Sequence, residues 1–151
     1  MSVGLQLFVP PRRRVLDWET RWAALLAHME RRPFAWGVAD CCTFAAANVE
    51  ALTGVAPMRF SEAWKTQGQA LWEVIHQGGI RFALGHLFGD PLLTPLLAQR
   101  GDLVLIEQVA DPSWPGLAVC EAGTWCAPGP LGLQRGPIEQ AQTAWPVGRE
   151  A

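Results

Sequence analysis

The run Asp-Cys-Cys-Thr at positions 40–43 holds the residues of this chain best suited to chemistry. It precedes an alanine-rich stretch, residues 44–52, which is typical of a helix and is followed by Gly54, a residue favoured just past a helix end. Asp40 is suited to cap this helix, because a carboxylate accepts hydrogen bonds from the backbone N–H groups of the first turn. Cys41 would then occupy the first helical position, where the helix dipole favours a thiolate. A thiolate attacks carbonyl carbon, so the run predicts Cys41 as a candidate nucleophile.

A cysteine nucleophile needs a general base, and the chain offers three histidines for that role: His28, His76 and His86. His28 and His76 fall within predicted helices, where a structural role is the favoured interpretation. His86 lies between glycine and leucine in a region expected to be a loop before the sheet. It is therefore the best substitute base, although a structural role is favoured for it as well.

Four cysteines, at positions 41, 42, 120 and 126, allow two interpretations. The favoured one makes Cys42, Cys120 and Cys126 small buried apolar residues. The alternative is a zinc or iron–sulfur site built from all four, but the spacing contains no CxxC pair. We therefore expect neither a metal nor another cofactor.

Composition limits the classes of protein that this chain can represent. The 151 residues are 50% hydrophobic and 17% charged, which predicts one folded domain rather than a disordered chain. The net charge of −2 gives no general attraction to nucleic acid. No run reaches the roughly 18 apolar residues needed to span a bilayer, and the order of apolar and basic residues near the start is opposite to that of a secretory signal. We expect synthesis in the cytoplasm, with the eight Trp serving several core and partner contacts.

The order of the predicted elements indicates an α+β fold, with helices first and an antiparallel meander second. Residues 1–16 are expected to form an extended arm, and residues 17–151 a single domain. Asp102 is expected to fix the start of the first strand of the sheet. The predicted helices are Asp17–Arg32, Asp40–Thr53, Glu62–Gln67 and Gln69–His76, and one or two further turns are expected within Ile80–Phe88. Asp17 is expected to cap the first helix, whose predicted apolar face holds Trp18, Trp22, Leu25, Leu26 and Met29. The predicted strands are Leu103–Val109, Leu117–Glu121, Thr124–Ala127, Leu131–Gln134 and Ala144–Val147.

The motif order resembles the NlpC-type branch of the papain-like cysteine peptidases. Asp-Cys at positions 40–41 matches the nucleophile motif of that family, and Gly-Asp-Leu-Val at positions 101–104 matches its first-strand motif. The segment Phe-Ala-Trp-Gly followed by Asp-Cys-Cys is also similar to short proteins encoded by tailed phages and prophages. The resemblance covers about residues 33–127. It implies a papain-like fold, in which the Cys41 helix packs on a small antiparallel sheet.

One residue of the family pattern is missing. The family places a catalytic His at the start of the second strand, and the matching positions here hold Pro115 and Gly116. No His follows His86 in the chain. Loss of the general base removes several kcal/mol of transition-state stabilisation, so the fold can be kept while activity is lost.

Two functions follow from the resemblance. The favoured one is a structural component of a phage or prophage virion, in the tail tip or tail assembly, whose partners are other tail or hub proteins. The alternative is an active cysteine endopeptidase or amidase that cleaves peptidoglycan during infection. For the N-terminal arm, docking on a neighbouring subunit and adding a strand to its own domain are both open.

Overall fold

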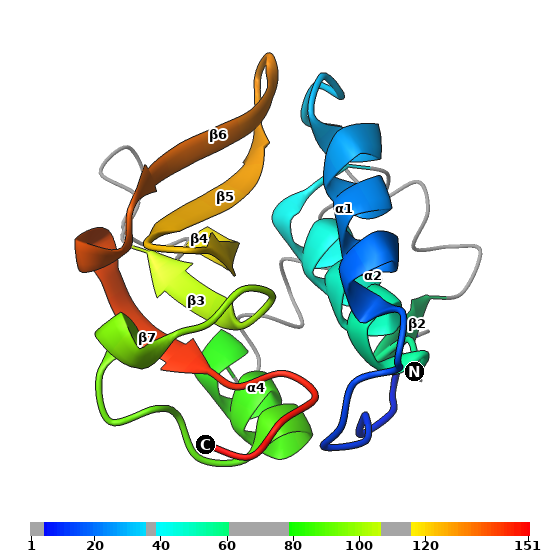
Figure 1. Ribbon diagram of the computed structural model, residues 1–151, viewed down its shortest axis with the longest axis vertical. Coiled ribbons are helices and arrows are strands. Elements are labelled where there is room, and N and C mark those ends of the chain that lie inside the picture. The colour runs from blue at the N-terminus through cyan, green and yellow to red at the C-terminus, as the bar shows by residue number, and fades with distance from the viewer. Residues whose placement is uncertain (1–4, 36–38, 61–78, 107–115) are drawn as a thin grey trace.

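The computed structural model describes residues 5–35, 39–60, 79–106 and 116–151, and it shows α-helices packed against an antiparallel sheet (Figure 1). The predicted α+β class is therefore confirmed. The helices are α1 (Trp18–Met29), α2 (Cys41–Thr53) and α4 (Ile80–Phe88), with short 3-10 turns at Pro95–Leu97 and Ile138–Gln140. The strands are β1 (Leu5–Leu7), β2 (Met58–Phe60), β3 (Leu103–Ile106), β4 (Gly116–Glu121), β5 (Thr124–Gly129), β6 (Gly132–Pro137) and β7 (Ala141–Trp145).

The main sheet has five strands in the order β6-β5-β4-β3-β7, and each neighbouring pair is antiparallel. The strands β3 to β6 form the predicted meander, while β7 returns to pair with the free side of β3. The predicted antiparallel pairing of the segments starting at Leu103 and Leu117 is confirmed by the register Leu103↔Val119 and Leu105↔Leu117. The strand expected to reach Val109 is described only to Ile106, and its last three residues lie outside the described ranges.

The central strands β3, β4 and β5 are largely buried, and alternate residues of β3 pack in clusters on opposite faces of the sheet. Leu103 and Leu105 pack in the cluster that includes α1, α2 and α4, whereas Val104 and Ile106 pack in a second cluster on the opposite face. Each such side chain contributes about 1.5–3 kcal/mol on burial. Helix α2 contacts β4 and β5 directly. The helix that begins at Cys41 therefore packs directly on this sheet.

Helix α1 is shorter than predicted, ending at Met29 rather than Arg32. Its apolar face is the predicted one, with Trp22 and Met29 buried. The carbonyl of Glu30 accepts a hydrogen bond from the N–H of Leu133 in β6, so the chain leaves the helix to meet the sheet edge. The prediction that Asp17 caps α1 through its side chain is wrong, because its carboxylate instead accepts from Nε of Arg21 at 3.0 Å.

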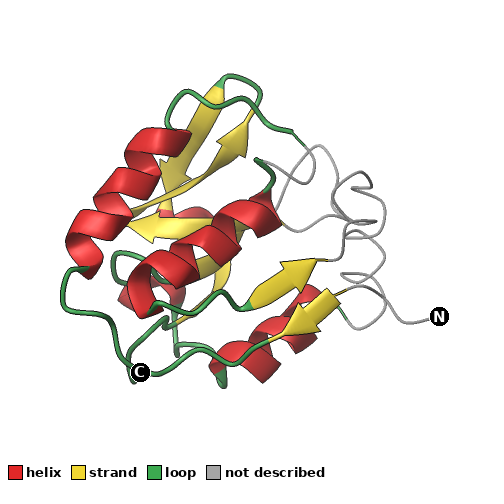
Figure 2. Ribbon diagram, turned by 90° about the vertical axis from the view of Figure 1, so that its right-hand side faces the viewer, coloured by secondary structure: helices red, strands yellow, loops and turns green. Residues whose placement is uncertain are grey.

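The segment expected to be an arm is packed on its own domain where it is described. Strand β1 pairs with β2 as a two-stranded ribbon, separate from the main sheet (Figure 2). Further along, the N–H of Val15 donates to the carbonyl of Leu52 in α2. Of the two possibilities for the arm, residues 5–16 therefore follow the one in which the arm adds a strand to its own domain.

The elements α4, β6 and β7 are of the predicted type, helix or strand, but their ends differ from the predicted ones. The segment Ile80–Phe88 is one continuous helix, and β6 and β7 are each shifted by a few residues from the predicted strands. The two helices predicted within residues 62–76 lie outside the described residues. Among the described helices, none is long and apolar enough to cross a membrane.

Candidate functional site

The N-terminus of α2 is built by a reciprocal pair of hydrogen bonds. The carboxylate of Asp40 accepts from the N–H of Thr43 at 2.8 Å, and the hydroxyl of Thr43 accepts from the N–H of Asp40 at 3.0 Å. This capping box fixes the direction of the first turn. At the other end, Gly54 has φ of 80°, and its N–H donates to the carbonyl of Glu50. The predicted cap and the predicted helix end are both confirmed.

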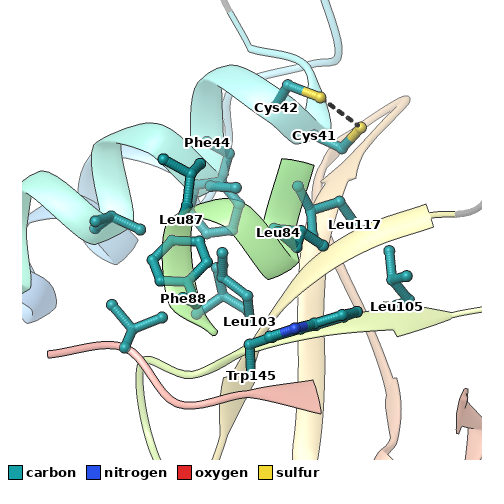
Figure 3. Close-up of a cluster of buried hydrophobic side chains, with 14 of the residues drawn as sticks. Cys41, Cys42, Phe44, Leu84, Leu87, Phe88, Leu103, Leu105, Leu117 and Trp145 are labelled. Carbon is teal, nitrogen blue, oxygen red and sulfur yellow. Dashed lines mark hydrogen bonds between the residues drawn. The ribbon is translucent and has the colours of Figure 1, made fainter. Parts of the chain in front are cut away.

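Cys41 is the first residue of α2, and its side chain is buried with 6% exposure. Its Sγ lies 4.0 Å from Sγ of Cys42 (Figure 3). The hydrogen bond to Cys41, together with burial, raises the pKa of Cys42 well above its usual range. Cys42 therefore keeps its proton and can donate its S–H to the neighbouring sulfur. In this arrangement the thiol of Cys42 is a hydrogen-bonding neighbour of the Cys41 sulfur.

The strand that faces Cys41 begins with residues that cannot accept a proton. Gly116 starts β4 opposite Ile106, and Leu117 is the first β4 residue in the cluster shared with α2. Leu117 and Leu84 belong to the same buried apolar cluster as Cys41 (Figure 3). The family pattern expects an imidazole near this end of the strand, and the described residues there are apolar.

The two histidines in the described ranges lie on exposed helix surfaces. His86 is in the last turn of α4, whose buried residues are Ile80, Leu84, Leu87 and Phe88. The expectation of a loop around His86 is wrong, because the apolar face of α4 continues through Gly85 and outweighs the low helix propensity of that glycine. His28 is exposed on α1 and lies 2.7 Å from Nη1 of Arg32. His76 is outside the described residues.

The cysteines are not gathered at one point. Cys126 belongs to the cluster on the α2 side of the sheet, and Cys120 belongs to the cluster on the opposite side. Burial raises the pKa of Cys120 to about 11 and raises that of Cys126 further. Within the described residues no group of three potential metal ligands occurs. The alternative of one site built from all four cysteines is therefore wrong.

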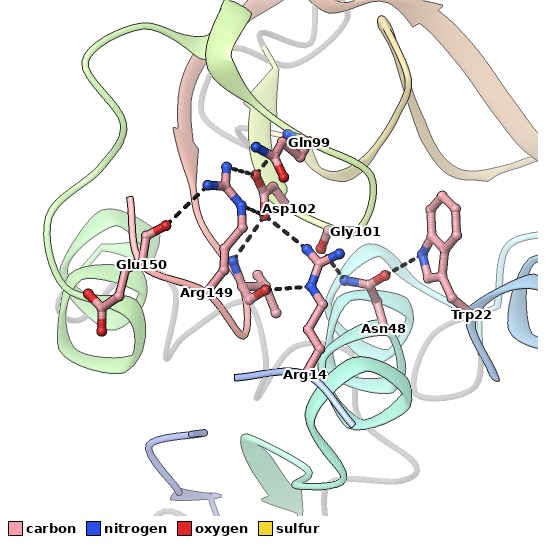
Figure 4. Close-up of polar contacts among 9 residues, drawn as sticks. Arg14, Trp22, Asn48, Gln99, Gly101, Asp102, Arg149 and Glu150 are labelled. Atoms are coloured by element: carbon pink, nitrogen blue, oxygen red, sulfur yellow. Dashed lines mark hydrogen bonds and ion pairs between the residues drawn. The ribbon is translucent and has the colours of Figure 1, made fainter. Parts of the chain in front are cut away.

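Asp102 is the most connected polar residue of the described chain, and it is completely buried (Figure 4). Its carboxylate accepts from Nη2 of Arg149 at 2.5 Å and from Nη2 of Arg14 at 3.3 Å. It also accepts from the backbone N–H groups of Gln99 and Val147, at 2.8 Å and 3.0 Å. The prediction that Asp102 fixes the start of the strand is confirmed, and its link to both ends of the described chain was not foreseen.

A second buried polar contact joins the helices to the sheet. Nε1 of Trp22 donates to Oδ1 of Asn48 at 2.8 Å, and Nδ2 of Asn48 donates to the carbonyl of Gly101 at 2.9 Å. Sequence reasoning missed this contact. The available signal was an asparagine within an otherwise apolar stretch, because a buried amide must find partners.

An apolar cavity of about 60 Å³ lies next to the Cys41–Cys42 pair. Cys42, Ala46 and Val49 of α2 line one side, and α4 lines another. Leu103 and Leu117 of the sheet also line it. Cys42, the neighbour of the predicted nucleophile, therefore borders an apolar space, whereas Cys41, Asp40 and His86 are not among the described lining residues.

In a comparison with known families, residues 13–147 match the family described as a domain of unknown function, DUF6950. The match covers most of the chain, and the chain belongs to this family. It includes the Cys41 helix, Asp102 and all five strands of the main sheet. None of the curated proteins compared with the chain matches it.

Proposed function

We propose that this protein is a component of a phage or prophage virion, in the tail tip or tail assembly, built on a catalytically degenerate NlpC-like, papain-like fold. The motif order of the sequence is the basis for the virion role. The arrangement of α2 on an antiparallel sheet is compatible with the fold, since Cys41 lies at the capped start of a helix that contacts β4 and β5.

The observation that carries the loss of activity is the apolar start of β4. A papain-like peptidase needs an imidazole that takes the proton of the thiol and returns it to the leaving amine. Here Leu117 occupies the first helix-facing position of that strand. The side chain of Cys41 is also only 6% exposed, which limits access for a substrate carbonyl. Both features favour a binding role over turnover.

The second candidate function is a cysteine endopeptidase or amidase that acts on peptidoglycan stem peptides. It is favoured by the capping box at Asp40 and by Cys42, whose retained proton can support a thiolate on Cys41. In this case the base must come from a histidine, and His86 is the first to test.

The two functions are separated by an activity measurement. We expect purified protein to release no more fragments from peptidoglycan, or from γ-D-glutamyl model peptides, than the Cys41→Ser variant does. Turnover that depends on Cys41 would overturn the proposal. In that event His86→Ala should be compared with His28→Ala, because both residues are exposed in the last turn of a helix.

The virion role has its own test. Particles produced by a phage that encodes this chain should contain it, as detected by mass spectrometry of purified tails. Particles carrying the Cys41→Ser variant should infect as well as the parent. Absence of the chain from purified particles would contradict the virion role even if no hydrolysis is found.

A further inference from the structure

Cys41 and Cys42 form a pair of adjacent thiols to which the virion role assigns no task. Their sulfurs lie 4.0 Å apart at the start of α2 (Figure 3), and all four cysteines of the chain are reduced. Cys120 and Cys126, by contrast, pack on opposite faces of the sheet. Of these two pairs, only Cys41 and Cys42 are therefore placed to react with each other.

The two adjacent thiols differ in how readily they meet an oxidant. Cys41 holds the first position of α2, where the helix dipole favours a thiolate, and the thiolate is the form of cysteine that reacts with oxidants. Its side chain is 6% exposed, that of Cys42 is 3% exposed, and those of Cys120 and Cys126 are fully buried. Exposure this small suits a small oxidant rather than a bulky one. Cys41 is therefore the thiol that a hydroperoxide reaches first.

A disulfide between these neighbours is incompatible with the helical backbone. Consecutive Cα atoms are about 3.8 Å apart across a trans peptide bond, whereas Cα atoms joined by a disulfide are usually about 4.4–6.8 Å apart. The backbone of Cys41 and Cys42 must therefore leave helical geometry when the bond forms. Both residues lie between Asp40 and Thr43, whose reciprocal hydrogen bonds cap α2, so the cap opens with them.

We propose that Cys41 and Cys42 are a modification site, at which a hydroperoxide forms a vicinal disulfide and thereby opens the capped start of α2. The Cys41 thiol loses its proton and attacks the O–O bond. Its sulfur gains one oxygen as a sulfenic acid, and the other oxygen leaves with the thiol proton as an alcohol or water. The sulfur of Cys42 then attacks that of Cys41, and the departing hydroxide takes the Cys42 proton as water. The two sulfurs are oxidised and the peroxide is reduced. The proposal goes beyond the virion role and does not depend on it.

Hydrogen peroxide is the probe, and trypsin separates the two pairs of cysteines. Residues 32–59 and 101–135 are single tryptic peptides, of which the first holds Cys41 with Cys42 and the second holds Cys120 with Cys126. We expect brief peroxide treatment of the folded chain, followed by unfolding and alkylation, to leave a disulfide in the first peptide. The second peptide should carry two alkylated thiols. Dithiothreitol should return the first peptide to two alkylated thiols as well.

Hydrogen exchange of backbone amides reports the opening of the cap. The N–H of Thr43 should exchange about tenfold faster in the oxidised chain, because its bond to the N-cap carboxylate is lost. The N–H of Val147, which donates to Asp102, is the internal control and should be unchanged. Reduction should restore the slower exchange of Thr43.

Two serine variants form a matched pair. In Cys42→Ser the reaction should stop at a sulfenic acid on Cys41, which dimedone traps, and the exchange of Thr43 should stay slow. Cys120→Ser should form the disulfide as the parent does. The proposal is overturned if peroxide leaves both thiols of the first peptide open to alkylation, or if Cys41 passes to a sulfinic acid without a disulfide. A disulfide that leaves the exchange of Thr43 unchanged would overturn it too.

Discussion

The buried carboxylate of Asp102 joins segments from both ends of the described chain, because both of its oxygens accept several hydrogen bonds. Its two oxygens receive two guanidinium groups and two backbone N–H groups. Burial of such a charge is costly, and the donors offset that cost only while all of them are present. The contribution of Asp102 to the free energy of unfolding is therefore best measured by removing its carboxylate.

We expect Asp102→Ala to lower the free energy of unfolding by about 3–5 kcal/mol, because Arg14 and Arg149 lose their counter-charge in a partly buried place. Urea denaturation measures the change. Asp17→Ala is the matched control, since Asp17 pairs with Arg21 at the surface with 60% of its side chain exposed. That control should cost at most about 1 kcal/mol. If both variants lose the same free energy of unfolding, the buried ion pairs of Asp102 stabilise the protein no more than the surface pair of Asp17 does.

The buried cysteines should make the stability of the protein depend on pH in the alkaline range. In the unfolded chain a thiol ionises near pH 8.5. In the folded chain the pKa of Cys120 is raised to about 11, and those of Cys42 and Cys126 are also raised. Above pH 8.5 the unfolded state thus binds fewer protons than the folded state, so stability is complete below that pH and is lost as pH rises.

The free energy of unfolding should therefore fall between about pH 8.5 and pH 11, by up to about 1.4 kcal/mol per pH unit for each thiol. The chain suits this measurement because it has no Tyr and its single Lys is Lys65. Denaturation at a series of pH values gives the slope. Cys120→Ala should reduce the slope by the share of one thiol. An unchanged slope in that variant would assign the alkaline loss to other groups.

Between elements, the contact of α1 with β6 depends on a glycine. Gly132 has φ of 124°, and a Cβ at this position would collide with the backbone carbonyl of Glu30 at the end of α1. The same contact is supported by Arg135, which bridges Glu30 and Glu121 at 2.6 Å and 2.7 Å. A backbone-to-backbone approach of this kind cannot be relieved by a rotamer change.

Gly132→Ala should consequently destabilise the protein more than a glycine substitution at a turn with open space. Gly123→Ala is the matched control, because Gly123 has φ of 83° and nothing within 4 Å of an added Cβ. Backbone strain alone should cost the control about 1–2 kcal/mol. The overpacking at Gly132 should add about 1–3 kcal/mol to that figure in thermal or urea unfolding. If both variants lose the same amount, the helix end moves away from β6 without penalty.

Sequence reasoning predicted the elements whose ends carry local signals. Asp40 and Gly54 delimit α2, and alternating or continuous apolar runs predict β3 and β4. Boundaries were less accurate where a tertiary contact decides them, as at Glu30, whose carbonyl bonds to β6 instead of continuing α1. For the site, the position of Cys41 could be predicted because capping is local. The ribbon, the cavity and the contacts of Asp102 could not, because they join residues far apart in the chain.

For the molecule as a whole, the described part of the segment before α1, residues 5–16, packs on the domain. Strand β1 pairs with β2, and Arg14 donates to Asp102 and to the carbonyl of Val147. The guanidinium of Arg14 also lies 4.4 Å from the ring centroid of Trp18. Removal of this segment should therefore act on folding before it acts on any assembly.

Deleting residues 1–14 should lower the melting temperature by about 6–12 °C, since loss of a partner from a buried charge costs about 3 kcal/mol and each kcal/mol corresponds to about 2–4 °C at this size. Deleting residues 1–9 is the control, because it removes β1 and keeps Arg14; its loss should be smaller. Differential scanning calorimetry measures both. A 1–14 deletion that keeps its melting temperature and fails to join its assembly would instead support docking by this segment.

The contacts of Asp102 also bear on the order of events during synthesis. Arg14 leaves the ribosome first, Asp102 follows, and Arg149 is added last; at about 5–20 residues per second this takes on the order of ten seconds. Between the addition of Asp102 and that of Arg149, 47 positions later, the nascent chain holds a carboxylate whose second guanidinium partner has not been made. Completion of the fold is therefore tied to translation beyond Arg149. A chain that stalls earlier, after β7 but before Arg149, carries an incomplete charge cluster at its centre and should be an open target for proteolysis.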